Sequence, residues 1–90
     1  MIAKRIIFSG RVQGVGFRYT TKQIAMGFDV TGWVKNLVDG RVELQVEGEE
    51  DDVAEFLEEL EENSVLAGNI RGVERHDASP LDGVSGFSIR

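Results

Sequence analysis

The chain of 90 residues contains no cysteine. It can therefore form no disulfide, zinc–thiolate or iron–sulfur site, and it has no thiolate nucleophile. No apolar run approaches the roughly 20 residues that span a bilayer, and the N-terminal residues lack the apolar core and cleavage site of a signal peptide. We expect a single domain, residues 1–90, located in the cytoplasm and without a membrane partner.

Histidine is almost as scarce, because His76 is the only one. A lone histidine has neither the partner ligands of a metal site nor a nucleophile to activate, so His76 is predicted to be a surface residue of a strand. Tryptophan is also represented once, by Trp33. A stacking platform for a ring or base is one interpretation of Trp33, but structural packing is the favoured one.

Positive charge is scarce as well, since ten basic residues face 16 acidic ones and the net charge is −6. Nine of the acids fall in residues 49–62, which contain no base; the remaining seven acids and ten bases sum to +3. Nucleic-acid binding needs a basic face, so we expect no nucleic-acid partner. A small anionic substrate stays possible, because local positive groups decide its binding.

Hydrophobic spacing predicts two helices among five strands. Apolar residues recur on one helical face in residues 17–28 and 53–60, and the acids of the second helix are expected on its solvated side. Strands are predicted at 4–11, 30–37, 41–47, 70–77 and 84–89, with turns at 38–40 and 79–83. The alternation in residues 41–47 predicts a strand with one solvent-exposed face.

The element order is β-α-β-β-α-β plus a short C-terminal strand. This order predicts an α+β fold, a ferredoxin-like split β-α-β sandwich. Its antiparallel sheet should carry both helices on one face. Such folds host many unrelated activities, so the function has to be sought in particular residues.

The segment most suggestive of chemistry joins the first strand to the first helix and contains Gly14, Gly16 and Arg18. Main-chain N–H groups in a glycine-containing turn before a helix can converge on an anion. An arginine in the first helical turn offers a planar set of donors that matches a phosphoryl group. Spacing alone leaves a second interpretation equally open, in which the glycines merely turn the chain and Arg18 is solvated.

Two longer motifs resemble the acylphosphatase family. The first is Gly10-x-Val12-Gln13-Gly14-Val15-x-Phe17-Arg18, and the second is Gly32-Trp33-Val34-Lys35-Asn36 followed by Gly40, Val42 and Gly48. The resemblance implies that Arg18 binds the phosphoryl group and that Asn36 orients the attacking water. It also implies a phosphate cradle of main-chain amides in the loop and first helical turn, which involves Gln13, Gly14, Val15, Gly16, Phe17 and Arg18. No metal and no organic cofactor is implied.

The expected activity is hydrolysis of a small-molecule acyl phosphate to a carboxylate and inorganic phosphate, by a monomer. The carboxylate leaving group needs no general acid, since its conjugate acid has a pKa near ~4. We expect a phosphoryl oxygen of the substrate to accept the proton of water, with Asp29 and Asp39 as weaker candidates for a base. The alternative function is a regulatory module of the same fold that binds phosphate or another anion without turnover.

Overall fold

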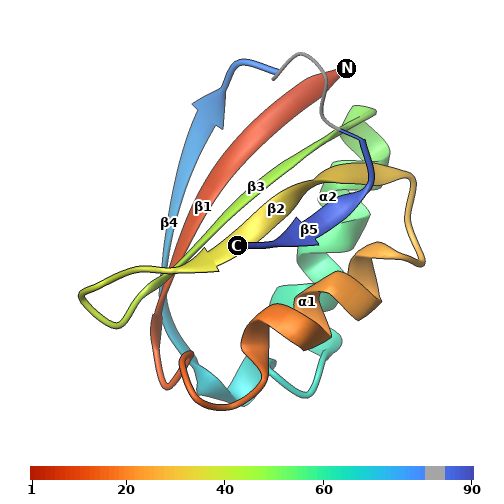
Figure 1. The fold of residues 1–90 in the computed structure, drawn as a ribbon. Coiled ribbons are helices and arrows are strands. Elements are labelled where there is room, and N and C mark those ends of the chain that lie inside the picture. The colour runs from red at the N-terminus through yellow and green to blue at the C-terminus, as the bar shows by residue number, and fades with distance from the viewer. Residues whose placement is uncertain (81–84) are drawn as a thin grey trace.

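A computed structural model of the chain describes residues 1–80 and 85–90. The strands are β1 (Ile2–Gly10), β2 (Val30–Asn36), β3 (Val42–Gly48), β4 (Ile70–Ala78) and β5 (Phe87–Ile89). The helices are α1 (Phe17–Ala25) and α2 (Glu50–Glu58), and α2 continues into a π-helical turn, Glu59–Asn63. A short 3-10 helix, Ala67–Asn69, precedes β4. This order confirms the predicted fold (Figure 1).

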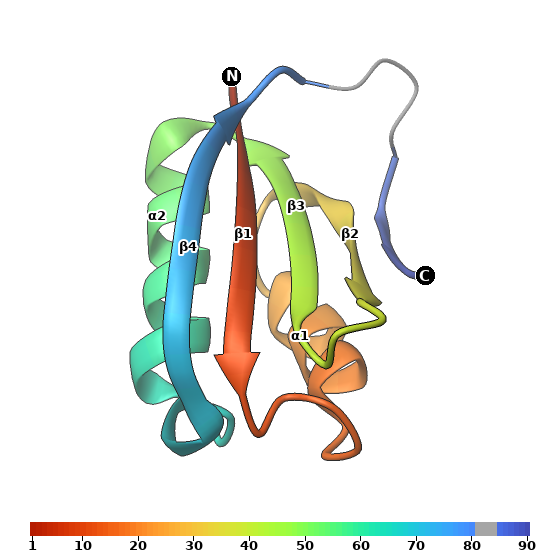
Figure 2. The ribbon, with the colours of Figure 1, turned by 90° about the vertical axis from the view of Figure 1, so that its left-hand side faces the viewer.

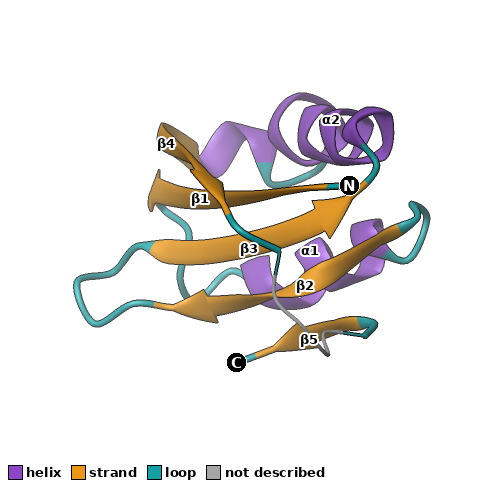
Figure 3. Ribbon diagram, turned by 90° about the horizontal axis from the view of Figure 1, so that it is seen from above, coloured by secondary structure: helices purple, strands orange, loops and turns teal. Residues whose placement is uncertain are grey.

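The five strands form one sheet in the order β4-β1-β3-β2-β5. The pairs β1–β3, β1–β4 and β2–β3 are antiparallel, as predicted. β5 runs parallel to β2, so the sheet as a whole is mixed and the prediction of a purely antiparallel sheet is corrected at this edge. Both helices cover one face, α2 behind β4 and β1, and α1 behind β3 and β2 (Figure 2). β5 lies at the edge beyond β2 (Figure 3).

The predicted final strand is shorter in the structure, because residues 85 and 86 are not part of it. Residues 81–84, which include part of the predicted turn at 79–83 and the predicted start of the last strand, lie outside the described residues. No helix in the described ranges is long and apolar enough to cross a membrane.

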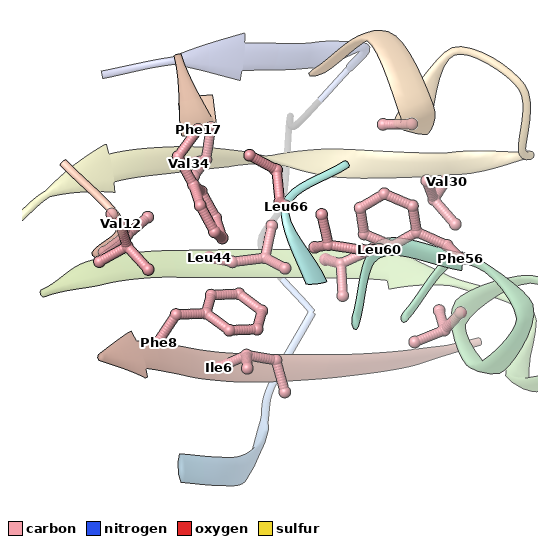
Figure 4. Packing of buried hydrophobic residues seen from close by; sticks show 14 residues of the cluster. Ile6, Phe8, Val12, Phe17, Val30, Val34, Leu44, Phe56, Leu60 and Leu66 are labelled. Atoms are coloured by element: carbon pink, nitrogen blue, oxygen red, sulfur yellow. The ribbon is translucent and has the colours of Figure 1, made fainter. Parts of the chain in front are cut away.

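A single apolar core fills the space between the sheet and the helices (Figure 4). Ile6, Phe8 and Leu44 point into it from the strands, and Phe56 and Leu60 meet them from the second helical segment. These five side chains are all fully buried. Burying such a side chain stabilises the fold by about 1.5–3 kcal/mol relative to leaving it exposed, so the helix spacing seen in the sequence reflects a real packing surface.

The expectation that β3 has one solvent-exposed face is wrong. Glu43, Gln45 and Glu47 alternate with the apolar residues as predicted, yet each is less than 10% exposed. β3 is the central strand, and long side chains of its neighbours cover its polar face. Glu43 accepts a hydrogen bond from Arg5 Nε, and its Oε1 lies 3.7 Å from Lys35 Nζ.

The acidic residues of α2 are mostly solvated, as predicted. Glu61, in the π-helical turn that follows, instead forms a bidentate ion pair with Arg75 of β4. This hydrogen-bonded pairing raises the pKa of Arg75. It places a positive charge beside an acidic helix C-terminus, where further carboxylates are unfavourable. His76 is exposed on β4, as expected for a surface strand residue.

Phe17 joins the first helix to the sheet. It is 2% exposed, and its ring centroid lies 5.3 Å from that of Phe8 on β1. We predict that Phe17→Ala lowers the free energy of unfolding in urea by about 3–5 kcal/mol, because it leaves a cavity in the core. Tyr19→Ala, on the exposed side of the same helix, is the control and should stay within about 0.5 kcal/mol of wild type. A loss below ~1 kcal/mol for Phe17→Ala would contradict this account of the core.

Candidate active site

The loop between β1 and α1 ends directly at the helix N-terminus. Gly14 and Gly16 have φ values of 78° and 76°, in the left-handed region that L side chains rarely adopt. Gly16 is also the N-cap residue of α1, and its carbonyl accepts a hydrogen bond from Thr20 N at 2.9 Å. The first N–H groups of a helix have no partner within it. The loop therefore leaves free main-chain donors next to the positive end of α1.

Two contacts fix the loop. At its C-terminal end, Phe17 packs on Phe8. In its middle, the side chain of Gln13 donates from Nε2 to Leu37 O at 2.7 Å and to Arg41 O at 3.0 Å. Leu37 and Arg41 flank the turn between β2 and β3. The loop is thus tied to the hairpin that carries Asn36.

Asn36 is the last residue of β2 and pairs with Val42 in the register of β3. It has the same strand parity as buried Val34, so it points toward the helix-covered face. Its side chain is exposed at the end of the strand.

Arg18 and Asn36 line one pocket of about 220 Å³ together with Gly14, Gly16 and Phe17. Of the predicted cradle residues, Gln13 and Val15 do not line it. The Gln13 side chain turns to the hairpin, and Val15 packs against the core. The structure thus brings together the two predicted catalytic residues and the two left-handed glycines of the loop.

Arg18 is oriented by the last strand. Its Nη1 donates to the main-chain oxygen of Arg90 at 2.9 Å. Arg90 N in turn donates to Val34 O at 2.8 Å, and its guanidinium lies 4.7 Å from the ring centroid of Trp33. No Asp or Glu of residues 1–80 and 85–90 pairs with Arg18. Arg90 O accepts from one N–H donor of Arg18, and the other donors have no Asp or Glu partner among these residues.

Trp33 and Lys35 contribute to the opposite face of the sheet. Trp33 is 7% exposed, and both the Arg90 guanidinium and Lys35 Nζ lie close to its ring, the latter 5.6 Å from the ring centroid. Packing is therefore its role, as favoured from the sequence. Lys35 pairs with Glu43, so its charge is directed to the open face and away from the pocket.

Asp39 is a turn residue. Its Oδ1 accepts a hydrogen bond from Arg41 N at 3.1 Å, and its Oδ2 accepts one from Arg41 Nε at 2.9 Å. The main-chain N–H of Arg41, with a smaller contribution from its guanidinium, holds the pKa of Asp39 below its usual value. Neither Asp39 nor Asp29 lines the pocket. No group of three or more His, Cys, Asp or Glu that could hold a metal occurs in the described part of the chain.

Sequence reasoning missed two contributions to this site. The side chain of Gln13 ties the loop to the β2–β3 hairpin, a role that the motif does not reveal. Arg90 follows directly after the three-residue strand β5, and it contacts Arg18, from which 72 positions separate it in the sequence. No local sequence pattern predicts the contact between Arg90 and Arg18, because the contact depends on the parallel pairing of β5 with β2.

Comparison with known proteins identifies the family. The family model described as acylphosphatase matches residues 4–89. A protein of Bacillus licheniformis named acylphosphatase is 40% identical over 89 residues, which are 99% of this chain and 98% of the relative. The chain belongs to the acylphosphatase family. The resemblance seen in the two sequence motifs is thereby confirmed.

Solved structures agree with the family membership. The crystal structure of acylphosphatase from Bacillus subtilis has a TM-score of 0.88 and 40% identity, over 100% of this chain and 99% of that one. The crystal structure of T. kodakarensis HypF has a TM-score of 0.86 and 34% identity; it matches 100% of this chain but only 12% of HypF. The same fold therefore occurs both in a chain of this size and inside a much larger protein.

The tie made by Gln13 gives a stability prediction. Gln13→Ala removes two hydrogen bonds from half-buried positions, so the free energy of unfolding in urea should fall by about 1–3 kcal/mol. Gln23→Ala is the matched control, because Gln23 is exposed on α1 and should change stability by less than about 0.5 kcal/mol. Equal unfolding midpoints for the two variants would show that the tie contributes nothing.

Proposed function

We propose that this acylphosphatase-family chain hydrolyses acyl phosphates, with Arg18 binding the phosphoryl group and Asn36 orienting the attacking water. The observation that carries the assignment of the site is the single pocket lined by Arg18, Asn36 and the left-handed glycines. The activity itself follows from the family. The products are a carboxylate and inorganic phosphate.

The phosphoryl group binds at the start of α1. Main-chain N–H groups of residues 13–18 face its oxygens, assisted by the partial positive charge of the helix N-terminus. The unused donors of Arg18 contact the same oxygens and stabilise the charge that they share in the transition state. The contact between Arg18 and Arg90 O supports this role, since it holds the guanidinium in place before the substrate arrives.

Water attacks the phosphorus directly, on the side away from the bridging oxygen. The side-chain carbonyl of Asn36 accepts a hydrogen bond from this water and fixes its direction of approach. A bond forms between the water oxygen and phosphorus, and the bond from phosphorus to the bridging oxygen breaks. Its electron pair leaves with the carboxylate, and the water proton passes to a phosphoryl oxygen of the substrate.

The site needs no acid for the leaving group and no side-chain base. A carboxylate is stable without protonation near neutral pH. Asn36 is an amide and does not titrate there, and Asp39 is engaged with Arg41. Phosphoryl transfer depends chiefly on positioning and charge stabilisation, which the loop, Arg18 and Asn36 can supply.

In this proposed function the active form of the chain is a monomer in the cytoplasm. Arg18, Asn36 and the loop all come from one chain, so a second copy is not needed to complete the pocket. The location rests on the sequence alone. An anion-binding module without turnover would use the same pocket, and it is distinguished by phosphate binding in the absence of hydrolysis.

Removal of either proposed catalytic side chain should abolish most activity. We expect Arg18→Ala and Asn36→Ala to lower kcat/KM for benzoyl phosphate at least tenfold, a loss of about 1.4 kcal/mol or more in transition-state stabilisation. The assay follows ultraviolet absorbance in the presence of EDTA, where wild type should stay fully active. Arg71→Ala and Asn63→Ala, at exposed positions outside the pocket, are the matched controls. Activity above a tenth of wild type in either pocket variant contradicts the assignment.

The pH dependence tests the proton acceptor. If the substrate accepts the proton, Asp39→Asn and Asp29→Asn should each leave the shape of the pH–rate profile between about pH 3 and pH 8 unchanged, a range that includes the ordinary pKa of an aspartate, about 4. Because the main-chain N–H of Arg41 lowers the pKa of Asp39, a limb caused by Asp39 as the base would fall in the most acidic part of that range. Disappearance of a limb in either variant would identify that aspartate as the base.

A further inference from the structure

The pocket has an apolar side that the phosphoryl chemistry does not use. Besides the groups already described, it is lined by Val12, Tyr19 and Ile89. Tyr19 is 63% exposed and Ile89 is 40% exposed, so both present apolar surface at the mouth of the pocket. Six large hydrophobic side chains are exposed in the described residues, and two of them border this one small pocket.

The positions of Tyr19 and Ile89 are fixed by contacts of their chain neighbours. Tyr19 follows Arg18 in the first turn of α1, and Ile89 precedes Arg90. Since Arg18 Nη1 donates to Arg90 O at 2.9 Å, the two apolar residues flank a direct contact between α1 and the end of β5. Ile89 is also paired with Val34 in the sheet. The apolar surface is therefore held at a constant position relative to the site of the phosphoryl group.

An acyl phosphate has one strongly charged end and one end whose character depends on the acyl group. Among the described residues that line the pocket, Arg18 is the only charged one. One cation suits one phosphoryl group, and no second cation is present in this lining for another phosphate or carboxylate on the acyl group. Beyond the phosphoryl group, the available contacts come from the ring of Tyr19 and the branched chain of Ile89.

We propose that Tyr19 and Ile89 form the acyl-binding side of the pocket and favour acyl phosphates with an aromatic or branched apolar acyl group over acetyl phosphate. This inference rests on the proposed function and specifies the substrate class of the same site. Apolar groups buried on binding add to the affinity of the transition state in proportion to the area removed from water. The acyl group of acetyl phosphate carries only a methyl group that can contact this surface, whereas a benzoyl group carries a whole aromatic ring.

The test measures a selectivity ratio, kcat/KM for benzoyl phosphate divided by kcat/KM for acetyl phosphate. We expect a wild-type ratio well above one, and we expect Tyr19→Ala and Ile89→Ala each to lower it by about fivefold or more. Tyr19→Phe should keep the ratio, because it retains the ring and removes only the hydroxyl. Val65→Ala, which truncates an exposed apolar side chain outside the pocket, is the matched control.

The outcomes separate this inference from the proposed function. Hydrolysis of both substrates with a ratio that Tyr19→Ala and Ile89→Ala leave unchanged overturns the acyl-binding role alone. A wild-type chain that prefers acetyl phosphate overturns it as well. Hydrolysis of neither substrate by wild type overturns the proposed function, and the inference with it.

Discussion

The packing of Phe17 against Phe8 fixes the geometry on which the proposed site depends. Because Phe17 is the first residue of α1 and is almost fully buried, the helix can begin at only one point relative to β1. Arg18 follows in the first turn, and the loop before it must reach the helix through two left-handed glycines. Gln13 then joins this loop to the β2–β3 hairpin. A contact in the core thus sets the separation of groups at the surface.

The distribution of charge explains how an acidic chain can present an anion site. The acidic helix α2 lies behind β4 and β1 (Figure 2). The pocket, in contrast, is lined by residues at the start of α1 and at the ends of β2 and β5. The two regions lie toward opposite ends of the strand order β4-β1-β3-β2-β5. Interactions between exposed charges that lie more than about 8 Å apart are largely screened at physiological ionic strength. The donors next to the pocket therefore outweigh the net charge of the chain.

Much of this architecture could be predicted from local patterns. The spacing of Val53, Phe56 and Leu60 predicts the second helix, and the alternation of apolar and polar residues in 41–47 predicts β3. The covered polar face of β3 could not be predicted, since it depends on which strands flank it and on side chains such as Arg5 reaching across. The same holds for Arg90, whose contact with Arg18 depends on the pairing of β5 with β2, which are far apart in the sequence. The motifs located Arg18 and Asn36, but only the tertiary structure places them in one pocket.

The strand register of β2 against β3 also has a consequence for folding. Asn36 faces the helix side only because it pairs with Val42; a slip of one residue would turn every side chain of β2 to the other face. Such a slipped chain could keep its secondary structure while carrying Asn36 on the wrong surface. Catalytic turnover would then serve as a sensitive reporter of correct strand alignment, which spectroscopic measures of helix and sheet content do not detect.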